Sequence, residues 1–160
     1  MSTLDKFKVS SEDKSIPKYK KATIYFALIR LHHKIRTACF CMTKVDRREY
    51  GEPLKKAVAD CIKDFVVAYD FETERPRYYM KLVADLHYLT VIVDEIDAYK
   101  VLRVPAKDVM DIVSGTRTEG WTNKPEKVIL QIYEEIGKID EGISKWRSTA
   151  MRSCSSSNSD

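Results

Sequence analysis

The sequence predicts an all-α fold, an up-down antiparallel four-helix bundle with a long loop or a short extra helix before the last helix. Apolar residues recur at steps of three and four in four separate segments, which is the spacing of one helix face. No segment shows the period-two alternation of a half-buried strand. The chain has 160 residues, of which 44% are hydrophobic, so it is long enough for one core.

The first two helices are predicted on either side of a short break. The first runs from Lys18 to about Met42, and its apolar face consists of Ile24, Leu28, Leu31, Ile35, Ala38 and Met42. The segment 44–51 is predicted to interrupt the helix, and Pro53 suits the first turn of a new one. The apolar face of this second helix consists of Leu54, Val58, Cys61, Phe65 and Ala68.

The third helix is predicted to follow the segment 70–76, with Thr73 or Pro76 at its start, and to run to about Leu102. Its apolar face consists of Tyr79, Leu82, Leu86, Leu89, Val93 and Ile96. Residues 103–124 are predicted to form a long loop that contains one short helix. The last helix follows a cap at Asn123, and its apolar face consists of Val128, Ile132, Ile136, Ile139, Ile143 and Trp146.

The bundle is predicted to span residues 18–150, between a flexible N-terminal segment (1–17) and a disordered, Ser-rich tail (151–160). No apolar run approaches the roughly 18 residues of a membrane span, so we expect no membrane insertion. Four cysteines at irregular spacing favour free thiols in a reducing compartment. Because the start of the chain also lacks an apolar signal segment, we expect a cytoplasmic protein.

The sequence lacks the patterns that carry common chemistry. It contains no Gly-x-Ser-x-Gly and no Gly-rich phosphate loop. Cys39 and Cys41 would diverge by about 200° on a helix, and His32 and His33 are adjacent, so neither pair suits joint metal ligation. His87 is the one candidate for acid–base work in a nuclease-like reading. We therefore expect a protein that is not an enzyme and that binds no cofactor or metal.

Charge is distributed unevenly along the chain. The net charge is +4, yet residues 1–63 carry 15 Lys/Arg and 7 Asp/Glu, whereas residues 64–160 carry 13 and 17. Either the basic half faces a polyanion, or the charges mix again in space once the helices pack. The candidate contacts to nucleic acid or a partner are Arg30, Lys34, Arg47, Arg48, Lys55, Lys56 and Lys63.

Several motifs together resemble a known family. They are Tyr25-Phe-Ala-Leu-Ile-Arg-Leu in the first helix, the pair Arg47-Arg48, a Leu-rich third helix from Leu82, and Glu135-Ile-Gly-Lys-Ile followed by Gly142 and Trp146-Arg-Ser. Over about residues 20–150, this layout resembles the accessory variability determinants (Avd) of diversity-generating retroelements. These are four-helix-bundle proteins related to those encoded by 23S rRNA intervening sequences.

The resemblance implies a non-catalytic accessory protein. It would assemble as a homopentamer, bind the reverse transcriptase of the element and its template RNA, and support mutagenic cDNA synthesis. The alternative is a four-helix-bundle protein-interaction module without a nucleic-acid role, with the loop 103–124 and Trp121 as its contact.

Overall fold

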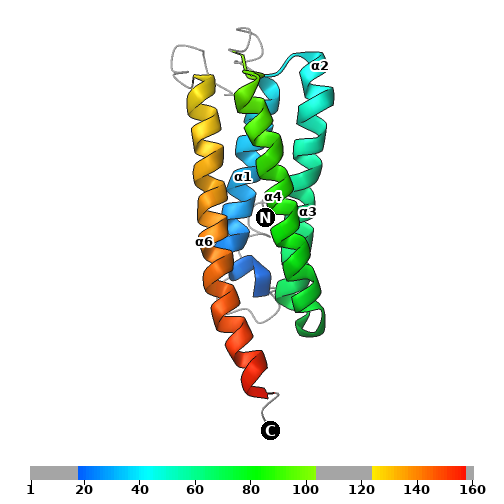
Figure 1. Ribbon diagram of the computed structural model, residues 1–160, viewed down its shortest axis with the longest axis vertical. Coiled ribbons are helices and arrows are strands. Elements are labelled where there is room, and N and C mark those ends of the chain that lie inside the picture. Colours follow the sequence, from blue (N-terminus) through cyan, green and yellow to red (C-terminus); the bar gives the residue numbers. More distant parts are fainter. Residues whose placement is uncertain (1–17, 104–123, 158–160) are drawn as a thin grey trace, which may run out of the picture.

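The computed structural model describes residues 18–103 and 124–157, with side chains as far as Thr149. Within these residues the secondary structure is helical, with no strand. The elements are η2 (Lys18–Lys21), α1 (Thr23–Phe40), α2 (Lys44–Asp46), η3 (Arg47–Gly51), α3 (Glu52–Asp70), η4 (Glu72–Glu74), α4 (Arg75–Ala98) and α6 (Pro125–Ser157). The long helices α1, α3, α4 and α6 lie side by side as a bundle (Figure 1).

The four predicted apolar faces form the core. Every residue of those faces is buried except Trp146, which packs against the core and stays partly exposed. The largest fully buried side chains include Phe65, Leu28, Leu86 and Ile132, one from each long helix. The helical periodicity therefore identified the buried face of each helix correctly.

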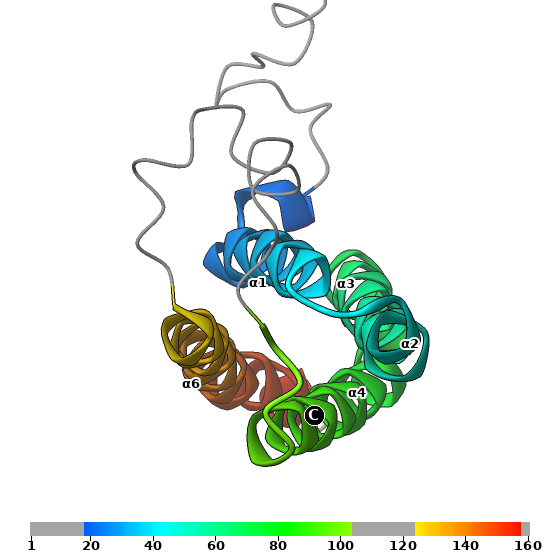
Figure 2. The same cartoon turned by 90° about the horizontal axis from the view of Figure 1, so that it is seen from above.

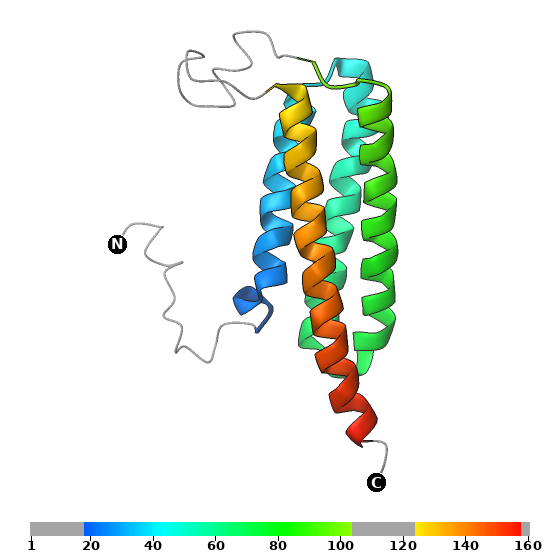
Figure 3. The same cartoon turned by 60° about the vertical axis from the view of Figure 1, so that its left-hand side comes forward.

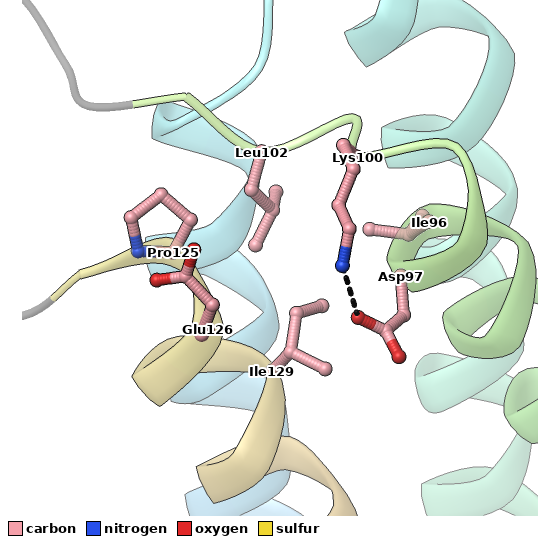
Figure 4. Close-up of a pocket in the computed structure, with 7 residues that line it drawn as sticks. All are labelled: Ile96, Asp97, Lys100, Leu102, Pro125, Glu126 and Ile129. Atoms are coloured by element: carbon pink, nitrogen blue, oxygen red, sulfur yellow. Dashed lines mark ion pairs between the residues drawn. The ribbon is translucent and has the colours of Figure 1, made fainter.

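Viewed along the bundle axis, α1, α3, α4 and α6 follow one another in a ring (Figure 2). The contacts between α3 and α4 and between α1 and α6 are extensive, whereas α4 and α6 meet more sparsely. A crevice of about 230 Å³ lies between the end of α4 and the start of α6, where Ile96, Leu102 and Ile129 line it beside the Asp97–Lys100 ion pair (Figure 4).

The predicted break at 44–51 is wrong, because residues 44–70 are helical throughout α2, η3 and α3. The connection after α1 is short, and Thr43 caps the new helix by accepting a hydrogen bond from the Asp46 N–H at 3.2 Å. Pro53 thus lies inside this helical stretch. The turn before it is a wider π turn, in which the Glu52 N–H bonds to the Arg47 carbonyl.

The third predicted helix ends earlier than expected, because α4 stops at Ala98 and not at Leu102. Lys100 adopts a positive φ of 53°. Its N–H bonds to the Asp97 carbonyl, and the Val101 N–H bonds to the Ile96 carbonyl, which is the Schellman arrangement that terminates helices.

The last helix extends further than predicted. Because α6 continues to Ser157, residues 151–157 are helical, and the expectation of a disordered tail is corrected for them. This stretch contains no Gly or Pro that would stop the helix. The expectations for residues 1–17, for the loop and short helix in 104–123, and for 158–160 lie outside the described residues.

Candidate nucleic-acid interface

The seven predicted basic residues do not form one cluster. Arg30 and Lys34 lie on α1 beside α6. The Arg30 Nε donates to both carboxylate oxygens of Glu135, at 3.2 and 3.4 Å, and the Lys34 Nζ donates to the Gln131 Oε1 at 3.3 Å. Glu135 is 7% exposed, so this carboxylate neutralises part of the charge of Arg30. Arg30 and Lys34 therefore have a structural role as well, because their hydrogen bonds connect α1 to α6.

Arg47 has a structural role at the corner between α1 and α3. Its Nε donates to the Cys39 carbonyl at 3.1 Å, and its Nη2 donates to the Met42 carbonyl at 3.2 Å. These carbonyls lie at the end of α1, where the regular helical hydrogen bonds stop and the Cys39 carbonyl also accepts from the Met42 N–H at 3.2 Å. The guanidinium of Arg47 therefore caps α1 and is not presented to solvent as a free charge.

Arg48 and Lys56 line a groove of about 500 Å³ between α3 and α4. The groove also contains carboxylates, and the Lys56 Nζ lies 3.7 Å from the Asp60 carboxylate. Asp85 lies on the opposite wall. This groove has mixed charge, which suits a polyanion less well than an acid-free surface does.

Lys55 lies on the side of α3 that faces α1. Its Nζ is 3.6 Å from Glu52, and its charge also reaches His32. Burial and then the charges of Arg36, His33 and Lys55 lower the pKa of His32. The charged groups that lower the pKa of His32 are all basic, and the α1–α3 seam around them also contains Glu52, which pairs with Lys55. Lys63 is exposed on α3, about two turns further along this helix.

The structure adds residues that the sequence reading missed. These are Phe26, His33, Arg36 and Phe40, which share the exposed side of α1 with the predicted Arg30; we call these five residues the α1 outer face. Phe26 is 51% exposed and Phe40 is 39% exposed. A simple signal pointed here, because residues 18–43 contain six Lys/Arg and no Asp or Glu.

This face has the composition of a surface that binds nucleic acid without a dedicated sequence motif. Cations at helical spacing neutralise phosphates, and exposed aromatic rings provide surfaces on which bases stack. The face extends over about 21 Å, at 1.5 Å per residue from Phe26 to Phe40. That length matches several phosphates of one strand.

The opposite side of the bundle has a different character. On α4, Met80, Tyr88 and Val91 are each more than half exposed, as is Tyr99 at the C-cap of this helix. Carboxylates on the same helix include Asp94 and Glu95. We call the exposed apolar residues Met80, Tyr88, Val91 and Tyr99 the α4 apolar face. Exposed apolar side chains gathered on one helix are typical of protein contacts.

Other ionisable groups are buried and lie apart from both faces. Burial and then hydrogen bonding to Asp85 raise the pKa of Asp64 to about 7. Burial also raises the pKa of the thiols of Cys39, Cys41 and Cys61, which disfavours the reactive thiolate. Among the residues that the structure describes, no group of three or more His, Cys, Asp or Glu could hold a metal ion.

None of the helices in the described part of the chain has the length and apolar character needed to cross a membrane. No protein-family model, curated protein or solved structure matches the chain.

Proposed function

We propose that the protein is a non-catalytic accessory protein of a diversity-generating retroelement, which binds template RNA and the reverse transcriptase during mutagenic cDNA synthesis. The observation that carries the RNA-binding part is the α1 outer face, within a segment of the chain that has six Lys/Arg and no carboxylate. The motifs that resemble the Avd family support the retroelement role. In this proposal, the polymerase performs the chemistry.

The α4 apolar face is our proposed contact for the reverse transcriptase. It offers Tyr88, Val91 and Tyr99 to a partner, on the side of the ring away from α1 (Figure 2). Separate faces let one bundle hold RNA and a protein at the same time. The linked sites would then raise each other's effective concentration.

We also propose the finer architecture and context that belong to this role. The long helices would follow an up-down antiparallel order, which is supported by the short connections on either side of α3 and by the alternating direction of the colours in Figure 3. The chain would assemble as a homopentamer and act in the cytoplasm, in keeping with the resemblance. Sedimentation at several concentrations tests the assembly, since a monomer throughout would contradict it.

The test of RNA binding uses a charge reversal on the α1 outer face. Arg36→Glu should weaken RNA binding and flatten its dependence on salt, because each phosphate contact releases counterions. Lys81 is exposed on α4, so Lys81→Glu makes the same charge change on another helix. It should leave the affinity for RNA nearly unchanged. Equal losses in the two variants would show that net charge, and not the α1 outer face, determines binding.

A second experiment tests the retroelement role itself. The DNA around the gene should contain a reverse-transcriptase frame and a pair of near-repeats that differ mostly at adenines. Finding neither would remove the retroelement role and leave the question of RNA binding to the charge-reversal test.

The second candidate is a protein-interaction module without a nucleic-acid role, and the α4 apolar face is the observation that favours it. In this reading Val91→Lys abolishes partner binding, and the wild-type protein does not bind RNA even at low salt. Binding of RNA that depends on Arg36 would exclude it.

A further inference from the structure

An open pocket of about 390 Å³ lies near the end of the bundle where α1 begins, between α1 and α6. Thr23, Tyr69, Lys145, Trp146 and Thr149 are among the residues that line it. In Figure 3 this is where the orange and red part of α6 passes the dark blue start of α1. The volume lies within the range of about 300–1,000 Å³ that is typical of small-ligand sites.

The pocket depends on a close approach of the two helices. A Cβ atom on Gly142 would lie 2.9 Å from the Ile24 Cγ1, so glycine is needed for this packing. One turn later on α6, Trp146 forms part of the pocket wall. Gly142 and Trp146 are also the pair that stands out in the motif of the last helix.

The Trp146 ring is held in place by other aromatic rings. Its centroid lies 5.8 Å from Phe65, 5.8 Å from Tyr69 and 5.9 Å from Tyr79. Despite these contacts Trp146 is partly exposed, and Tyr69 is partly exposed beside it. The Arg75 guanidinium also lies over the Trp146 ring, 6.0 Å from its centroid. Two partly exposed aromatic side chains therefore line one pocket with their positions fixed by packing, and aromatic side chains are the groups on which unpaired bases stack.

One cation lines the pocket and others lie nearby along the chain. Lys145 lies on the wall with 76% of its side chain exposed, 3.0 Å from Glu141. Ala22, which also lines the pocket, directly follows the three lysines of η2. The α1 outer face begins within one turn of the pocket, at Phe26. A strand bound along α1 would thus pass from Arg30 over the uncharged residues 22–29 to Lys145 at the pocket.

We propose that this pocket takes one unpaired base of a single-stranded RNA whose backbone lies along the α1 outer face. The proposal rests on the proposed RNA binding and adds the class of RNA, because bases in a duplex are stacked on each other and cannot enter. Aromatic platforms beside cationic tracks bind single strands in this manner, with little preference for sequence.

Fluorescence of the full chain tests the proposal. The chain has two tryptophans, so Trp121→Phe leaves Trp146 as the one reporter. A short oligouridylate should quench Trp146 and bind more tightly than the abasic oligomer of equal length, by about 5- to 100-fold. Trp146→Leu should remove this difference, whereas Trp146→Phe should retain much of it.

A second variant tests the pocket independently, in case Trp146→Leu does not fold. Thr149 is exposed at the pocket, so Thr149→Leu fills space there without touching the core. It should also reduce the preference for the oligouridylate, with helicity unchanged by circular dichroism.

The outcomes separate this proposal from the proposed function. If both oligomers bind equally and Trp146 fluorescence stays constant, while Arg36→Glu still weakens binding, the pocket proposal is overturned and RNA binding stands. If neither oligomer binds at low salt, both the proposed RNA binding and the pocket proposal are overturned. A preference for duplex RNA over the oligouridylate would overturn the pocket proposal alone.

Discussion

Gly142 on α6 and Ile24 on α1 lie so close that a Cβ atom on the glycine would be 2.9 Å from the Ile24 Cγ1. Real Cβ atoms essentially never approach a neighbour this closely. Gly137 on the same helix behaves differently, because a Cβ there would meet nothing within 4 Å. The two glycines of α6 therefore have opposite roles.

This difference predicts opposite effects of alanine at the two positions. Gly137→Ala should raise the free energy of unfolding by about 0.5–1 kcal/mol, because alanine is the better helix former. At Gly142 the same gain is outweighed by overpacking against Ile24, which typically costs about 1–3 kcal/mol. Urea unfolding followed by circular dichroism measures both, and stabilisation by Gly142→Ala would show that Ile24 moves aside freely.

The ion pair between Arg30 and Glu135 predicts that removing the charge of Glu135 lowers the stability of the fold and raises its affinity for RNA. Glu135→Gln should cost on the order of 1 kcal/mol, a modest loss because the side chain of Arg30 is 50% exposed. It should also strengthen RNA binding several-fold, since the charge of Arg30 is no longer neutralised. Exposed Glu134→Gln is the matched control. Unchanged affinity in Glu135→Gln would place Arg30 outside the RNA contact.

The buried carboxyl of Asp64 predicts that stability falls as the pH rises. Its pKa is about 7 in the folded state, raised from 3.8 by burial and by Asp85. Between about pH 4 and 7 the folded chain therefore holds a proton that the unfolded chain has lost, so its stabilising contribution decreases through this window. Asp64→Asn should flatten the decline and be roughly 1–2 kcal/mol more stable than wild type at pH 8.

Exposed Asp140→Asn serves as the control for this pH series. It should follow the wild-type curve of unfolding free energy against pH. A wild-type curve without any decline between pH 4 and 7 would mean that Asp64 ionises normally in the fold.

Lys100 predicts a stabilising substitution at the end of α4. Its φ of 53° lies in the left-handed region, which costs a residue with a Cβ roughly 1–2 kcal/mol. Lys100→Gly removes this strain but adds entropy to the unfolded chain, so we expect a net gain of about 0.5–1 kcal/mol. Lys100→Ala keeps the strain and should be near wild type, and thermal unfolding ranks the three proteins.

The fold was largely predictable because a buried helix face leaves a periodic trace in the sequence, whichever helix it meets. The boundary at 44–51 was not, because this segment was interpreted as a break before a new helix at Pro53, whereas Thr43 caps a helical stretch that already begins at Lys44. A π turn, in which the Glu52 N–H bonds to the Arg47 carbonyl, directly precedes Pro53. The residues that favour a break in segment 44–51 therefore did not prevent it from being helical.

The candidate site was less predictable, since the availability of a cation depends on its spatial neighbours. Arg30 meets Glu135 from a helix 105 residues away, and Arg47 turns inward to cap α1. Spacing along one helix shows neither contact. Arg36 was overlooked, and His32 was considered only as a metal ligand, although the stretch 18–43 visibly contains no Asp or Glu.

The basic surroundings of His32 predict that RNA binding strengthens as the pH falls. In the free protein, burial and the neighbouring Arg36, His33 and Lys55 keep the pKa of His32 below 6.5. A bound phosphate would favour the imidazolium and raise this pKa, so the complex takes up a proton between the free and bound values. Affinity should rise from pH 7.5 to pH 6, and His32→Gln should weaken this dependence, as should His33→Gln to a lesser degree. NMR titration of the His32 ring with and without RNA measures the shift directly, and an unchanged pKa would place the phosphates away from the α1–α3 seam.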